Sequence, residues 1–171
     1  MALVTVGVLV AAFTLASVGR ATPETFCIGR SEVVELSPGV SMKPSAGTGH
    51  TVVTGAVECT GPIEEHQPTG PISTTHFFNY GYAGPDTCTD MEIKGWVDYS
   101  VPTATGLVVL RNHFTETVKP LSDPSHTLMF NGDRFSGRAL IQSAEGDCVT
   151  SPLTRLKFGW IGHWHGPRAT G

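Results

Sequence analysis

Apolar and polar side chains alternate with a period of two along most of the chain after residue 22. In the segment 91–101, MEIKGWVDYSV, apolar side chains and one glycine occupy the odd positions, whereas the even positions hold polar side chains and Trp96. This alternation is typical of a β-strand with one face on the core and the other in water. No stretch repeats convincingly with the period of a helix. The pattern therefore predicts an all-β fold.

The alternating segments and the turn residues between them predict about eight strands. We expect strands at residues 32–36, 50–59, 73–82, 91–101, 106–118 and 153–164, and a hairpin over residues 125–142. The hairpin turn is placed at Asn131 and Gly132, because both residues tolerate positive φ. Strands at this spacing are typical of a single antiparallel β-barrel or of a two-sheet β-sandwich, and alternation does not distinguish these two folds.

The first 19 residues contain no charged side chain and end at Gly19, before Arg20 and Ala21. A largely apolar segment followed by small residues is typical of a secretory signal peptide. We expect residues 1–21 to be this peptide and residues 22–171 to form one disulfide-stapled β domain that is secreted. After cleavage, no stable membrane association is expected. The alternative is an uncleaved membrane anchor of marginal length.

Four cysteines follow this segment, at Cys27, Cys59, Cys88 and Cys148. An even number of cysteines in an exported chain predicts disulfide bonds, and the absence of a CxxC pair argues against a zinc knuckle or a redox motif. Three pairings are possible. We favour Cys27 with Cys59 and Cys88 with Cys148, since each bond then ties strands within one half of the chain. In the loop-entropy account each bond stabilises the fold by about 3 to 4 kcal/mol.

Six short segments carry a resemblance across most of residues 22–171. In chain order they are CIGR, VVELSPGVSMKP, VVTGAVECTG, KGWVDYS, NGDRFSGRALI and GDCVTSPLTRLKFG. This order of turns, glycines and cysteines resembles a group of small exported, cysteine-containing β proteins of actinobacteria. The resemblance implies secretion, an all-β fold and paired cysteines, and it implies no reaction.

Charge and motifs remove several classes of function. The 171 residues carry a formal net charge of -4, and no cluster of lysines and arginines occurs, so nucleic acid is not an expected partner. The chain has no GxSxG motif and no aspartate-rich calcium loop. We therefore expect no cofactor, and a partner that is a small apolar ligand or a protein surface.

One predicted strand places an ionisable ring on its apolar face. In STTHFFNYGY, His76 lies on the same side as Tyr80. If the strands close into a barrel, this side faces the lumen together with Tyr99, Asn112 and Glu116. A buried carboxylate beside a buried imidazole is a candidate acid/base pair. The alternative is that His76 and Glu116 make a structural hydrogen bond, or lie in water near strand ends.

The segment GWIGHWHG places His163 and His165 two residues apart near the C-terminus. On a strand, both imidazoles point to the same side, opposite Trp160 and Trp164. Two histidines at this spacing are weak candidates for a zinc or copper site, because such a site usually needs a third protein ligand. The sequence identifies no third ligand, and two surface histidines without a metal are the alternative.

Three functions are compatible with these features. The first is a secreted β domain that binds a small apolar ligand or a partner surface without catalysis. The second is a barrel enzyme of cyclase or isomerase type, with His76, Tyr80, Tyr99, Asn112 and Glu116 in its lumen, a comparison that rests on fold analogy. The third is an exported structural or inhibitor-type protein. An apolar pocket without His76 and Glu116 favours the first function, and an enclosed pocket that holds them within hydrogen-bond reach favours the second. A filled core with a protruding rigid loop favours the third.

Overall fold

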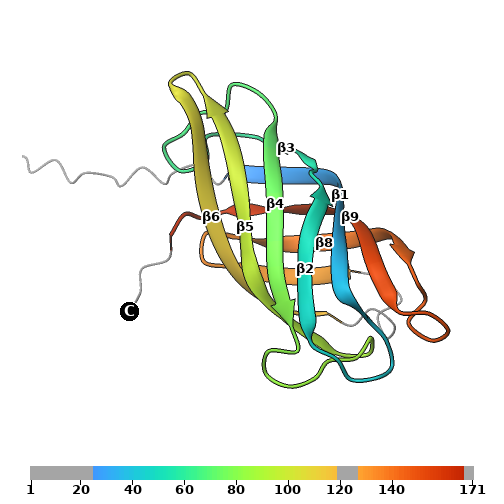
Figure 1. The fold of residues 1–171 in the computed structure, drawn as a ribbon. Helices are drawn as coiled ribbons and strands as arrows, with labels where there is room; N and C mark the ends of the chain where they lie inside the picture. The colour runs from blue at the N-terminus through green and yellow to red at the C-terminus, as the bar shows by residue number, and fades with distance from the viewer. Residues whose placement is uncertain (1–24, 119–126, 168–171) are drawn as a thin grey trace, which may run out of the picture.

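The computed structural model describes residues 25–118 and 127–167, and these residues form an all-β protein (Figure 1). The nine strands of the described chain are β1 Thr25–Val40, β2 Gly47–Val53, β3 Ala56–Cys59, β4 Ile72–Tyr80, β5 Met91–Thr103, β6 Gly106–Val118, β7 Thr127–Gly132, β8 Phe135–Glu145 and β9 Leu153–Trp164. The described residues contain no helix that is long and apolar enough to cross a membrane. The expected signal peptide at 1–21 lies outside the described residues.

The strands close into an antiparallel barrel, which decides between the two predicted folds. Neighbouring strands pair from β4 through to β9, and β9 then pairs with β1. Both β2 and β3 pair with β1 on one side and with β4 on the other, so they occupy a single position in the wall. The result is a closed barrel of eight wall positions with one extra strand.

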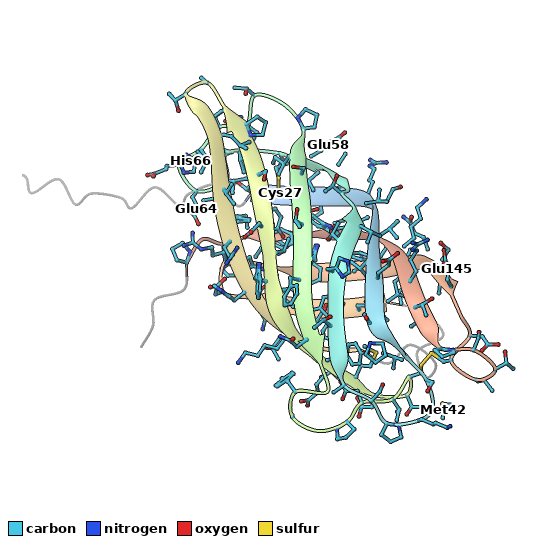
Figure 2. The ribbon with its side chains drawn as sticks, viewed as in Figure 1. Cys27, Met42, Glu58, Glu64, His66 and Glu145 are labelled. Carbon is cyan, nitrogen blue, oxygen red and sulfur yellow. A yellow bond between two sulfur atoms is a disulfide. The ribbon has the colours of Figure 1, made fainter. Side chains whose placement is uncertain are left out.

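The predicted alternation is confirmed in the strands that carry it. Along β5 the odd positions are buried, and along β4 and β9 the even positions face inward. Figure 2 shows charged side chains such as Glu58 and Glu145 pointing away from the barrel. Tyr99, Phe135, Trp160 and Trp164 pack edge to face or tilted inside the barrel, with ring centroids 5.1 to 6.0 Å apart. Aromatic pairs in these arrangements add stability beyond that from the burial of their surface.

Strand β1 changes its inward face partway along its length. Before the change Thr25 and Cys27 are buried, and after it Glu32, Val34 and Leu36 are buried. The register with β9 shifts between Gly29 and Glu32, and the intervening Ser31 has φ of 58°. A bulge adds one residue to a strand and so moves the next side chains to the other face. This bulge turns a carboxylate into the barrel.

The preferred disulfide pairing is confirmed. Cys27 bonds to Cys59, joining β1 to the paired strand β3, and Cys88 bonds to Cys148. The second bond ties the β4–β5 loop to the β8–β9 loop, and both of its cysteines are buried. It therefore fastens two loops across one end of the barrel.

The position of the predicted hairpin turn was wrong by two residues. Asn131 and Gly132 belong to β7, Asn131 pairs with Ser136, and the two residues between the strands are Asp133 and Arg134. Gly132 does not have positive φ. A Cβ at Gly132 would lie 2.2 Å from Oδ1 of Asn112, so the glycine is required by close packing rather than by the turn.

Two predicted strands differ most from the observed ones, whereas the other expected bounds agree within three residues. The segment 50–59 is divided into β2 and β3 at Thr54 and Gly55, where a Cβ on Gly55 would lie 2.7 Å from the carbonyl oxygen of Arg30. The strand expected at 32–36 extends over Thr25–Val40, because its bulge interrupts the alternation on which the shorter prediction was based.

Candidate functional site

A cavity of about 70 Å³ lies inside the barrel. Seven strands line it, and most of the lining is aliphatic or aromatic, including Leu128, Phe130, Phe158 and Trp160. The volume exceeds the roughly 10 to 15 Å³ that one water molecule requires. No lysine or arginine belongs to the described lining, whose polar residues are His76, Tyr99, Asn112 and Glu116.

Behind His76 lies a carboxylate that was not among the site residues predicted from the sequence. Glu32 has no exposed surface, and its Oε1 is 2.5 Å from Nδ1 of His76. Thr51 Oγ1 donates to Oε1 at 2.8 Å, and Thr74 Oγ1 donates to Oε2 at 2.9 Å. A buried carboxylate is tolerated when its oxygens are met by donors, as they are here.

The imidazole of His76 bridges this buried carboxylate and the cavity. Its side chain is 15% exposed, and its ring contacts Phe114 and Phe158 edge to face, both of which line the cavity. Within the described chain Nε2 has no hydrogen-bond partner. When Nδ1–H is held by a carboxylate, the neutral ring carries its lone pair on Nε2. His76 therefore presents an acceptor to the cavity.

Tyr99 adds a donor close to His76. In the β4–β5 register His76 pairs with Val97 and Thr74 pairs with Tyr99, so His76 and Tyr99 are diagonal neighbours on the inward face. Burial, and secondarily the charge of Glu32, raise the pKa of Tyr99 well above its usual value. The hydroxyl therefore stays protonated, and no described residue accepts its hydrogen bond.

Glu116 supplies a second carboxyl group to the lining. Burial raises its pKa to about 8, because apolar surroundings disfavour the charged form. It lies one residue beyond the described pairing of β6 with β7, which consists of Phe114 with Gly132 and Thr115 with Asn131. At neutral pH Glu116 is therefore mainly a neutral hydrogen-bonding group, positioned where β6 separates from β7.

Asn112 has a structural task that the sequence did not reveal. Its Oδ1 accepts hydrogen bonds from the backbone N–H groups of Arg134 and Phe135, each at 2.9 Å. These bonds hold the turn between β7 and β8 against β6. Because its oxygen already accepts these two hydrogen bonds, Asn112 has a structural role in the cavity wall.

Tyr80 does not line the cavity, contrary to the lumen set expected from the sequence. It is buried, as its parity predicts, but its hydroxyl donates to the carbonyl oxygen of Pro38. Burial raises its pKa. The bond links β4 to the end of β1 and makes Tyr80 a packing residue.

The structure brings His76, Tyr99, Asn112 and Glu116 to one cavity, but the partner of His76 is Glu32 and not Glu116. A signal for Glu32 was present in the sequence, because Glu32 has the same parity as the apolar Val34 and Leu36. Distant pairing of β1 with β2, and of β2 with β4, was required to place it beside His76.

His163 and His165 both point outward, as the parity of β9 predicts. His163 packs edge to face on Phe26, and His165 interacts with Ser136 Oγ at 3.2 Å and with the carbonyl of Gly166. Across residues 25–118 and 127–167, no group of three or more His, Cys, Asp or Glu side chains is arranged to hold a metal ion. The two imidazoles thus have separate packing partners.

Comparison of the chain with protein-family models, with curated proteins and with solved structures found no match. The function must therefore be argued from the barrel and its interior.

Proposed function

We propose that this protein binds a small, largely apolar and uncharged molecule inside its barrel. The observation that supports the proposal is the cavity, whose lining is mainly apolar and includes a small number of polar groups. Sites for small molecules typically combine an apolar wall with a few polar groups that orient the ligand.

The lining also defines the chemistry of the ligand. Without a lysine or arginine in the described lining, an anionic ligand has no counter-ion there, and Glu32 places a carboxylate behind His76. Desolvating a charge without a partner is unfavourable. A compact hydrocarbon framework that bears a hydroxyl or carbonyl group fits best, because Tyr99 and Glu116 can donate to it.

Binding is proposed to take place outside the cell. Two disulfides are compatible with an oxidising compartment, and the apolar segment at the start of the sequence is typical of an export signal. A purely structural or inhibitor-type role receives less support, since that role does not require a cavity in the barrel.

The test is calorimetric titration of the oxidised protein with toluene, a compact apolar probe. Ala139 lines the cavity, and its neighbour Leu140 is exposed on the same strand, so Ala139→Phe and Leu140→Phe form a matched pair. We expect saturable binding to the unmodified protein and to Leu140→Phe, and affinity at least about tenfold lower for Ala139→Phe, because the added ring occupies the cavity. Equal affinity in the two variants would refute the proposal.

A further inference from the structure

We propose that His76 is a general base, held by Glu32, that removes a proton from the carbon next to the carbonyl group of a small neutral ketone bound in the cavity. This inference rests on the proposed function, since the ketone must first enter the barrel. It adds an activity to binding.

The base has its supporting contacts already in place. Glu32 is fully buried and holds Nδ1 of His76 at 2.5 Å, while Thr51 and Thr74 hold the carboxylate itself. The backbone N–H of His76 also donates to Thr51 Oγ1 at 2.7 Å. An imidazole fixed through one nitrogen, with the other nitrogen free, is the usual arrangement of a histidine base. Glu32 is thus a positioning residue and His76 the catalytic residue.

The group that would receive the carbonyl oxygen is the hydroxyl of Tyr99. His76 and Tyr99 are diagonal neighbours across β4 and β5, a relation that separates residues by roughly 7 to 8 Å and their Cβ atoms by somewhat less. Both side chains line the same cavity, so a carbonyl group bound there can face Tyr99 while the adjacent carbon faces His76. The aromatic rings of Trp160 and Trp164 pack perpendicular to Tyr99, with centroids 6.0 and 5.1 Å away, and restrict its orientation.

The reaction balances without any co-reactant. Nε2 of His76 takes the proton, the electron pair of the broken C–H bond forms the carbon–carbon double bond, and the carbonyl π electrons move to the oxygen. Tyr99 donates a hydrogen bond to that oxygen, which carries the negative charge of the enolate. Return of a proton from the imidazolium to carbon restores the ketone. In D2O the returning nucleus is deuterium, because the partly exposed ring exchanges its proton with solvent.

A neutral ketone is the substrate class that this cavity favours. The acidic hydrogen of such a ketone lies on carbon, so the substrate enters uncharged, and the wall around it is apolar. Apart from His76 and Tyr99, the titratable residue of the described lining is Glu116 on β6, and its raised pKa keeps it mostly uncharged at neutral pH. It therefore adds little charge to oppose the enolate.

The experiment follows the exchange of the ring hydrogens next to the carbonyl of cyclopentanone in D2O by proton NMR. His76→Gln removes the base, and His50→Gln, on the exposed face of β2, is the matched control. We expect exchange at least about 100-fold slower with His76→Gln than with the unmodified protein or His50→Gln. Tyr99→Phe should lower the rate by at least about tenfold, because the enolate oxygen loses its hydrogen-bond donor.

The rate of exchange should rise with pH in the unmodified protein and not in His76→Gln. A merely structural histidine would not give this difference. Binding of cyclopentanone is measured in the same samples by saturation transfer. Binding without exchange above the His76→Gln rate overturns the catalytic inference and leaves the binding proposal standing. Absence of binding overturns both. If His76→Gln does not fold, as judged by circular dichroism, unchanged exchange in Tyr99→Phe is the result that overturns the inference.

Discussion

Glu32 and His76 show how two side chains remove an electrostatic cost inside an apolar barrel. The carboxylate is fully buried, yet two threonine hydroxyls and one imidazole nitrogen meet its oxygens. A charge buried without such partners destabilises a fold by several kcal/mol. Loss of His76 therefore removes a hydrogen-bond partner from the buried carboxylate and destabilises the fold, whereas loss of a surface histidine leaves no buried group without a partner.

His76→Ala should destabilise the protein by about 3 kcal/mol or more, because it leaves Glu32 buried with one partner fewer and opens space beside Phe114 and Phe158. His163→Ala, at an outward position of β9, should cost less than about 1 kcal/mol. Urea unfolding of both variants measures the difference. An equal decrease in the free energy of unfolding of both variants would show that the contact between His76 and Glu32 does not stabilise the interior.

Glu116 gives the folded state a pH dependence of defined sign. Its pKa is raised from 4.5 to about 8 in the fold, so between these values the folded state holds a proton that the unfolded state has released. Folding stability from this group is therefore fully present below about pH 4.5 and is lost as pH rises through 8. Partial solvent access limits the loss to the order of 3 kcal/mol.

The measurement is the free energy of unfolding of the unmodified protein and of Glu116→Gln between pH 5 and 9. Glutamine keeps the shape of the neutral acid and cannot ionise. We expect the difference in stability to shift progressively in favour of Glu116→Gln as pH rises. Parallel curves for the two proteins would contradict a raised pKa at this position.

At the scale of elements, alternation predicted most of the barrel and could not predict its irregularities. Strand β9 begins and ends where the pattern placed it, and β5 and β6 were anticipated almost completely. The bulge before Glu32 was missed because it depends on how β1 bends between β3 and β2, which no local pattern reports. The parity of Glu32 was visible, but its partner is far along the chain.

The β7–β8 turn illustrates a second limit. Asn131 and Gly132 are a strong local turn signal, yet Asn112 on β6 captures the backbone N–H groups of Arg134 and Phe135 and shifts the turn two residues onward. The glycine then lies against the side chain of Asn112. A contact between separate strands thus outweighs a local preference.

Gly132→Ala should destabilise the protein by about 2 kcal/mol, because its Cβ would lie 2.2 Å from the Asn112 oxygen that holds the turn. Gly84→Ala is the control, since no atom lies within 4 Å of a Cβ at that position. The control should change stability by less than about 1 kcal/mol. Thermal unfolding compares the two, and a neutral Gly132→Ala would show that the asparagine is free to move.

At the scale of the whole molecule, closure of the sheet creates the interior from which the proposed function is argued. The pairing of β9 with β1 removes the sheet edges, and the Cys88–Cys148 bond fastens loops at one end. The sequence left open whether a barrel or a sandwich forms, because both give the same alternation. It could not reveal a cavity, since a cavity depends on how side chains from seven strands meet.

The most direct test of the central claim is the diffraction of crystals of the oxidised protein under xenon pressure. Xenon enters apolar cavities without needing a hydrogen bond, so it reports space and access alone. We expect a xenon atom inside the barrel, in contact with Leu128, Phe130 and Trp160. Xenon found only on the outer surface, or not at all, would contradict a binding cavity within this barrel.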